Sequence, residues 1–243
     1  MRRAIAAAVG VMFTLGTLVT SAPAQYGREV GKGLFWVECD VTTEERSIDP
    51  IMAFGGISAH EQVIFGSKLG RRSTGNTLRA RGFTTCSAPV DFSGYWVPTF
   101  HDADGNLVTP DDIVVYFYAM GDRTRVPFPQ DFGRVSEEVY YTCGRGTPRG
   151  TDFRSCPAPT SPRMIIIFKP GPGDPNFPET RLGIRWTSQV GADPSTWTAS
   201  SDPGPMHGDF LNAWKRRDLR MLIDKCLNDP TPVKCGMITP GDL

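Results

Sequence analysis

Six cysteines constrain the fold of this chain more than any other feature, because all of them lie downstream of an export signal. Two arginines follow Met1, an apolar run covers residues 4–19, and Ser21–Ala24 has the small-residue pattern of a cleavage site. These features predict a secretory signal peptide over residues 1–24, since the apolar run is short for a membrane span. We therefore expect a secreted, extracellular protein with no membrane span after signal cleavage.

An even number of cysteines in an oxidising compartment predicts disulfide bonds. The sequence alone does not select one of the fifteen pairings that six cysteines allow. We favour pairs that close short loops or connect an early strand to a later one: Cys39–Cys86, Cys143–Cys156 and Cys226–Cys235. A zinc–thiolate site is a weaker interpretation, because the chain has no C-x-x-C pair.

The composition favours a β-rich fold, with 26 glycines, 21 prolines and more strand-like than helical runs. The strand candidates are residues 34–41, 62–66, 78–86, 95–101, 113–120, 139–143, 163–169 and 181–187. In the last of these, Leu182, Ile184 and Trp186 alternate with polar residues and should face the core. Asp104–Gly105 predicts a hairpin turn, and a calcium loop is disfavoured because Ile113 stands where its last acidic ligand belongs.

One amphipathic helix is expected near the C-terminus, over residues 210–226. Apolar residues recur there at helical spacing, and Asp209 stands at the N-cap position. Beyond it, residues 227–243 form a tail held by Cys235. The predicted fold is mainly β: residues 25–243 form a single antiparallel β-sandwich or jelly-roll-like domain with one C-terminal α-helix and long loops.

The charge balance and the motif content exclude several classes of function. Lysine plus arginine and aspartate plus glutamate number 26 each, so loss of Arg2 and Arg3 with the signal leaves a net charge of about −2. No basic face is implied, and a nucleic-acid partner is not expected. The sequence contains no G-x-S-x-G elbow, P-loop or H-E-x-x-H motif.

Two polar stretches are the candidates for a functional site. Residues 49–67 (DPIMAFGGISAHEQVIFGS) place polar residues between apolar runs, where burial is costly unless they are paired. His207 and Asp209 precede the expected helix, whose dipole would favour a neutral imidazole at His207. We hypothesise that the stretches converge, with His60, His207 and Asp209 as catalytic residues. The ligand-binding candidates are Asp49, Ser58, Gln62, Tyr95 and Trp96.

Structural roles for the same residues stay open. Asp209 fits an N-cap, and a lone His60 is often a satisfied structural histidine. Tyr95 and Trp96 could stack on a sugar ring or fill the core, and the core is favoured. Glycoside hydrolysis needs two carboxyl groups across a sugar ring, for which Asp209 with Asp49 or Glu61 is the pair to test.

Several motifs occur in an order that resembles a known family. They are Asp49–Ile51 (DPI), Ser58–His60 with Phe65–Gly66, Thr84–Cys86 (TTC), Ser93–Phe100 (SGYWVPTF) and His207–Trp214 (HGDFLNAW). Together they resemble DUF1996, a secreted domain of unknown function found in fungi and bacteria, over residues 35–226 or so.

The resemblance implies a polysaccharide or cell-envelope setting by association. The family pattern has a second histidine where this chain has Gln62. It also has a Cys-Trp-Asp-Gly block with further histidines that is missing here. His60, His207 and Asp209 are the matching positions that remain, as in a reduced relative of the family.

Three functions are compatible with these observations. The first is a carbohydrate-active hydrolase or lyase that uses His60, His207 and Asp209. The second is a non-catalytic module that binds polysaccharide or cell-envelope glycan, with no cofactor in either case. The third is a secreted metal-binding protein, ranked last because two histidines without a further nitrogen or carboxylate ligand make a poor site.

Overall fold

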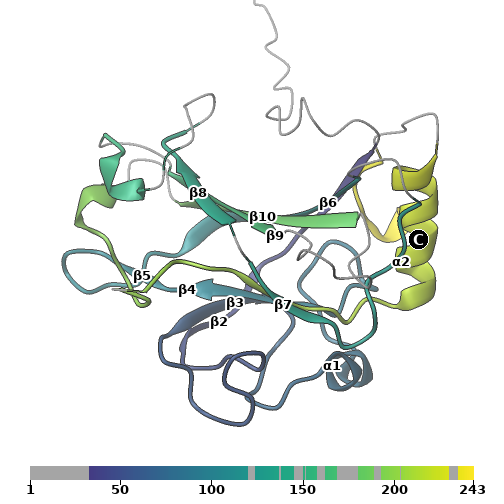
Figure 1. Ribbon diagram of the computed structural model, residues 1–243, viewed down its shortest axis with the longest axis horizontal. Helices are drawn as coiled ribbons and strands as arrows, with labels where there is room; N and C mark the ends of the chain where they lie inside the picture. Colours follow the sequence, from purple (N-terminus) through teal and green to yellow (C-terminus); the bar gives the residue numbers. More distant parts are fainter. Residues whose placement is uncertain are drawn as a thin grey trace, which may run out of the picture.

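The computed structural model describes residues 33–119, 124–136, 138–144, 150, 152–157, 162–168, 180–188, 193–202, 204–229 and 235–243 (Figure 1). The predicted signal peptide and the glycine- and proline-rich loop after residue 168 lie outside these residues. Within them, no helix has the length and apolar character needed to cross a bilayer.

Two main antiparallel sheets form the body of the protein. The larger has the order β13-β1-β6-β10-β9-β8, and only the pairing of β13 with β1 is parallel. Its strands are β1 (Leu34–Glu38), β6 (Pro110–Ala119), β8 (Glu138–Thr142), β9 (Arg163–Phe168), β10 (Thr180–Ser188) and β13 (Gly236–Met237). The burial of Leu182, Ile184 and Trp186 confirms the predicted core-facing side of β10.

The smaller sheet has five antiparallel strands in the order β2-β3-β4-β12-β7. They are β2 (Val41–Arg46), β3 (Gln62–Gly66), β4 (Gly94–Pro98), β7 (Gly133–Val135) and β12 (Asp209–Leu211). A separate two-stranded ladder joins β5 (Phe100–His101) to β11 (Thr198–Ala199). The mainly β fold class is therefore confirmed.

The main core lies between the two large sheets, which face each other in Figure 1. Phe35 of β1 stacks on Phe117 of β6, with ring centroids 4.8 Å apart, and Tyr95 of β4 stacks on Phe210 of β12 at 5.3 Å. Trp214 closes one end, edge-on to Phe117. Because these rings come from both sheets, their burial holds the layers together.

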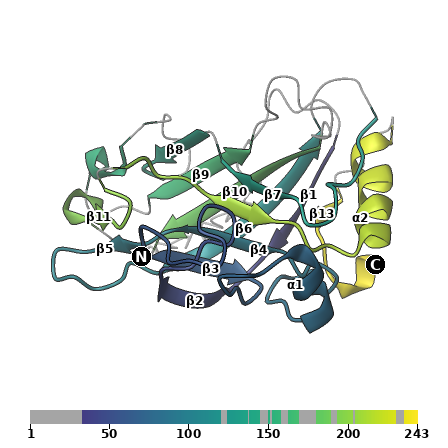
Figure 2. The same ribbon diagram turned by 60° about the horizontal axis from the view of Figure 1, so that its bottom comes forward.

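A second, smaller core covers the outer face of the five-stranded sheet. Ile64, Trp96 and Leu211 contribute from three adjacent strands, and Leu78 of helix α1 (Gly75–Arg81) packs on them. Helix α1 lies on that side of the sheet in both ribbon views (Figures 1 and 2). Strands β3, β4 and β12 are therefore buried on both faces, so polar side chains on them are shielded from water.

Two predicted strands needed correction. Residues 34–41 divide at Cys39, so that β1 and β2 belong to different sheets. The predicted strand at 78–86 is wrong, because helix α1 occupies its first half. Thr74 caps that helix with a capping box, and Gly82 ends it in the left-handed conformation at φ 64°.

The predicted helix over 210–226 begins too early. Helix α2 covers Arg216–Ile223 and continues into a π-helical turn, Asp224–Asn228. Asp209–Leu211 form strand β12 instead, with Phe210 paired to Tyr95 on one side and Arg134 on the other. Asp209 is therefore not an N-cap, and His207 is not at a helix N-terminus. Tertiary strand pairing outweighed the helical spacing of the apolar residues.

Three disulfides connect the predicted partners, which confirms all three pairings: Cys39–Cys86, Cys143–Cys156 and Cys226–Cys235. The first joins the chain between β1 and β2 to the segment after α1. The last ties Cys235, directly before the C-terminal strand β13, to Cys226 in the middle of the π-helical turn, as expected for the tail.

Candidate functional site

Strand β12, which lies between β4 and β7, carries a buried carboxylate. Asp209 pairs with Trp96 of β4 and Val135 of β7, and its side chain has no exposed surface. Directly opposed residues of antiparallel strands point to the same face. Asp209 therefore shares the outer face with Trp96, on the side where the loop between β2 and β3 folds back.

That loop, residues 47–61, supplies Asp49 and His60 from its two ends. Asp49 Oδ1 accepts hydrogen bonds from the backbone N–H groups of Ile51 and Met52, both at 2.9 Å. The Ser58 N–H donates to the Ser47 carbonyl at 3.1 Å and closes the loop. Ser58 Oγ also accepts from the His60 N–H at 3.4 Å, so this serine shapes the loop.

The two polar stretches of the sequence meet at this place. His60 Nε2 lies 3.2 Å from His207 Nε2, although the residues are 147 positions apart. His207 Nε2 lies 3.3 Å from Asp209 Oδ2. Asp49, His207 and Asp209 each offer a ligand atom, all within 4.8 Å of one another. We call Asp49, His60, His207 and Asp209 the His/Asp centre.

The backbone fixes the hydrogen position on His207. Its Nδ1 lies 3.2 Å from the carbonyl oxygen of Pro205, which can only accept a hydrogen bond. Nδ1 therefore carries the hydrogen, and in the neutral ring Nε2 carries a lone pair. That lone pair faces the Asp209 carboxylate and the His60 ring, and it accepts a hydrogen bond when His60 carries its hydrogen on Nε2.

Three side chains on adjacent strands are buried without a protein partner. Among the described residues, neither Asp209 oxygen has a hydrogen bond, because the 3.3 Å approach of His207 does not have hydrogen-bonding geometry. The Gln62 amide on β3 and the Trp96 Nε1–H on β4 are unpaired as well. Such groups are rare because each pays its desolvation cost uncompensated. Other buried polar atoms without a hydrogen bond occur elsewhere in the described residues, but these three side chains come from adjacent strands and face the same side of the sheet, which makes this face the candidate for binding a polar group or an ion.

Burial shifts the protonation of the centre in two directions. Desolvation raises the pKa of Asp209 well above its ordinary value, and the nearby charge of Asp49 adds to this rise. Desolvation, followed by repulsion from His207, lowers the pKa of His60 against an opposing effect of Asp49. His60 is therefore a neutral imidazole at pH 7.

The other predicted ligand-binding residues have structural surroundings. Tyr95 is fully buried, stacks between Phe65 and Phe210, and donates its hydroxyl hydrogen to Asp91 Oδ2 at 2.9 Å. Trp96 is also fully buried. Neither ring is accessible to stack on a sugar, in keeping with the core interpretation. Glu61 points to His101, with the oxygen and Nε2 3.7 Å apart.

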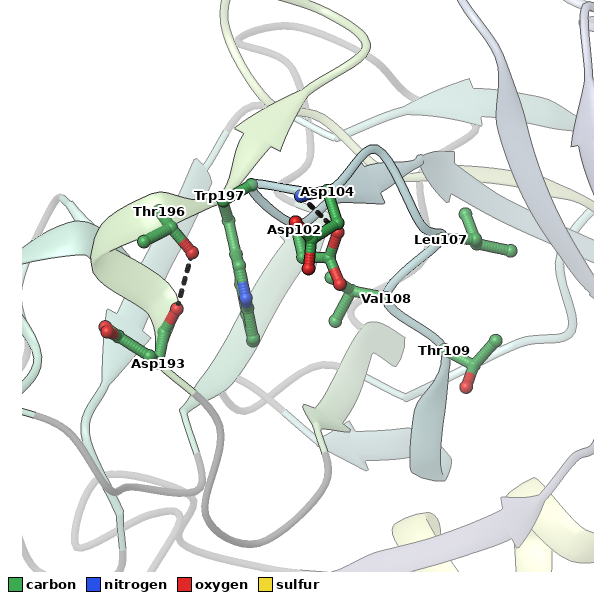
Figure 3. Close-up of a pocket in the computed structure, with 9 residues that line it drawn as sticks. Asp102, Asp104, Leu107, Val108, Thr109, Asp193, Thr196 and Trp197 are labelled. Atoms are coloured by element: carbon green, nitrogen blue, oxygen red, sulfur yellow. Dashed lines mark hydrogen bonds between the residues drawn. The ribbon is translucent and has the colours of Figure 1, made fainter.

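A cavity of about 350 Å³ lies elsewhere, between the Asp102–Asn106 turn and the segment 193–197 (Figure 3). Two of its aspartates accept hydrogen bonds from backbone N–H groups within their own turns. Asp102 Oδ1 accepts from the N–H groups of Asp104 and Asn106, and Asp193 Oδ1 accepts from Ser195. Gly105 has φ +80°, as the predicted hairpin turn requires. The carboxylates of Asp102 and Asp193 are therefore already engaged.

A comparison with protein-family models matches residues 49–169 to DUF1996, a domain of unknown function. The matched segment begins at Asp49 and contains His60, whereas His207 and Asp209 follow its end. Neither the curated proteins nor the solved structures contain a match to the chain. The family match agrees with the resemblance seen in the sequence motifs, and the chain belongs to the DUF1996 family.

Proposed function

We propose that this chain is a secreted metal-binding protein whose His/Asp centre holds one divalent first-row ion and serves hydrolysis. The signal-like N-terminus and the three disulfides support export. The observation that carries the metal proposal is the buried, unpartnered carboxylate of Asp209 beside the lone pair of His207. A cation between them would satisfy both groups at once.

The spacing of the donor atoms supports this proposal. Two ligands bound at about 2.0–2.1 Å to one tetrahedral ion are themselves about 3.3 Å apart. The Nε2 atoms of His60 and His207 are 3.2 Å apart, and His207 Nε2 is 3.3 Å from Asp209 Oδ2. Asp49, His207 and Asp209, whose ligand atoms lie within 4.8 Å of one another, offer one nitrogen and two carboxylates. His60 lies outside this group and would add a second nitrogen through its position beside His207. This combination suits zinc and neighbouring divalent ions.

The metal-binding interpretation, ranked last from the sequence, thus gains the carboxylate ligands that it lacked. Asp49 and Asp209 come from segments far apart in the chain, and the fold brings both to His207. A bound ion would polarise a substrate oxygen or lower the pKa of a coordinated water. Asp209 is buried while His60 is only partly buried, so we expect substrate to approach from the His60 side.

The substrate class that we propose is an extracellular polysaccharide or cell-envelope glycan, hydrolysed or cleaved by a lyase step. Its support is the setting implied by the family resemblance. A non-catalytic glycan-binding module has less support, because Tyr95 and Trp96, its two aromatic candidates, are buried.

A metal-free acid–base site is the second candidate. Asp209, His207 and His60 form a line of titratable groups with 3.3 Å and 3.2 Å steps, running from a buried acid to a partly buried imidazole. The pKa values of its two ends move in opposite directions, as in sites where one group donates and another accepts a proton.

Metal binding is tested first, by calorimetric titration of the chelator-treated chain with Zn²⁺ and Mn²⁺ and by elemental analysis after dialysis. We expect one ion per chain, and at least about tenfold weaker binding in His207→Ala and Asp209→Asn. His101→Ala is the control, because it removes a histidine outside the His/Asp centre. Absence of binding, or equal losses in His101→Ala and His207→Ala, would contradict the metal proposal.

Activity is then measured as product release from a panel of envelope and plant-type polysaccharides. A metal-dependent hydrolase loses activity with chelator and regains it with Zn²⁺ or Mn²⁺. Activity that resists chelator but disappears in His60→Ala supports the acid–base candidate. Product release that survives His207→Ala would refute the assignment of the site. Metal binding without cleavage of any polymer would refute only the substrate class.

A further inference from the structure

One loop exposes the most apolar surface in the described part of the chain. Met52, Phe54 and Ile57 are 71%, 59% and 68% exposed, whereas no other described large apolar side chain exceeds 40%. All three belong to the 47–61 loop that also carries Asp49 and His60. Isolated exposed apolar residues are ordinary, but a cluster of this kind marks an interaction surface.

The loop that displays these side chains is held in place by backbone and side-chain contacts. The Ala53 N–H donates to the Asp49 carbonyl at 2.9 Å, and the Gly55 N–H donates to the Arg71 carbonyl at 2.7 Å. Ile51 packs on the second core beneath the loop. Gly55 adopts φ +77°, which the turn requires and glycine tolerates. The loop is therefore fixed by several backbone hydrogen bonds and by the packing of Ile51, and its three apolar side chains are nevertheless exposed to solvent.

Two arginines lie beside this loop, although the whole chain is formally neutral. Residues 62–90 contain five lysines and arginines and no acid. Arg71 and Arg72 are exposed and, among the described residues, have no ion pair. They lie beside the loop, because a Cβ built on Gly55 would be 3.4 Å from Arg72 Nε. Figure 2 shows α1 and the loops next to β2 and β3 on one side of the molecule.

We propose that Met52, Phe54, Ile57, Arg71 and Arg72 form a docking surface for an anionic lipid bilayer. Apolar side chains that enter the headgroup region, flanked by cations that meet anionic lipids, are the general signature of interfacial binding. A sugar polymer fits this surface less well, because sugars stack on aromatic rings and Phe54 is the only aromatic residue among the three apolar side chains. Docking would also bring Asp49 and His60, at the two ends of the loop, close to the membrane surface.

Vesicle sedimentation tests this proposal with the secreted chain. Phosphatidylcholine vesicles with and without phosphatidylglycerol serve as the probe, at low and high salt. We expect binding to the anionic vesicles that weakens with salt. Met52→Ser/Phe54→Ser should bind at least about tenfold more weakly, because the inserting side chains are lost. Arg71→Gln/Arg72→Gln should remove the preference for anionic lipid.

Met221→Ser is the matched control, because Met221 is 40% exposed on α2, away from the loop. It should bind as the unmodified chain does, and thermal melts should show that all variants are folded. No binding to either vesicle, or wild-type binding by Met52→Ser/Phe54→Ser, would overturn the proposal. A third outcome would also overturn it: the unmodified chain binds no vesicles and is a dimer in light scattering, and Met52→Ser/Phe54→Ser is a monomer. A second copy of the chain would then occupy the surface. The metal-binding proposal does not depend on either outcome.

Discussion

A buried acid outside the His/Asp centre makes the stability of this protein depend on pH in an unusual direction. Asp91 has no exposed surface; its Oδ1 accepts from the Ser93 N–H at 3.0 Å, and its Oδ2 accepts from the Tyr95 hydroxyl at 2.9 Å. Burial outweighs these hydrogen bonds and raises the pKa of Asp91 from 3.8 to about 6. The folded chain therefore binds more protons here than the unfolded chain between these two values.

The sign and size of the effect follow from this difference. Where the folded state holds the extra proton, the free energy of unfolding decreases as pH rises. The contribution of Asp91 is complete below about pH 4 and is lost as pH passes through about 6. A difference of about two pH units corresponds to about 3 kcal/mol of stability. Replacing Asp91 by asparagine removes this term and keeps an acceptor for Ser93.

Urea unfolding followed by tryptophan fluorescence at pH 4, 5, 6 and 7 measures the effect. The stability difference between Asp91→Asn and the unmodified chain should move by about 2.5 kcal/mol in favour of the variant from pH 4 to pH 7, because pH 4 already lies just above the unfolded pKa. Asp102→Asn is the control with opposite sign, because hydrogen bonds from Asn106 lower the pKa of Asp102, so its contribution is lost as pH falls. An Asp91→Asn difference that stays constant across this range would refute the raised pKa.

Two further changes test the site and the packing. Asp209→Asn should stabilise the metal-free chain by about 1–2 kcal/mol, because it removes a buried carboxylate that has no hydrogen bond. The same change should weaken metal binding. A melting temperature below that of the unmodified chain, both measured in chelator, would contradict the predicted stabilisation. Gly94→Ala should cost about 1–3 kcal/mol, because a Cβ at that position would lie 2.5 Å from Leu69 Cδ2. In a Leu69→Ala background the Gly94→Ala change should cost less, because the contact with Leu69 is then absent, and the denaturation midpoints of both single variants and the double variant measure this coupling.

The sequence predicted features that depend on nearby residues. The run at 62–66 coincides with β3, and the alternation of Leu182, Ile184 and Trp186 identified the buried side of β10. The two short-range disulfides followed from separations of 13 and 9 residues. In each case spacing along the chain limits the outcome, because periodicity and loop closure act over short distances.

Long-range strand pairing decided the rest. Phe210 and Leu211 fit the apolar spacing of a helix, but with Asp209 they form β12 between β4 and β7. These neighbouring strands bury Asp209, whose carboxylate lies beside His207. The sequence allowed the two polar stretches to converge, and only the folded chain brings Asp49 and Asp209 to the same imidazole. The net charge of the whole chain, which is zero, does not predict that Arg71 and Arg72 lie beside the apolar loop. Charge, burial and ligand geometry depend on neighbours in space, and residues 147 positions apart become neighbours only through the sheet that joins them.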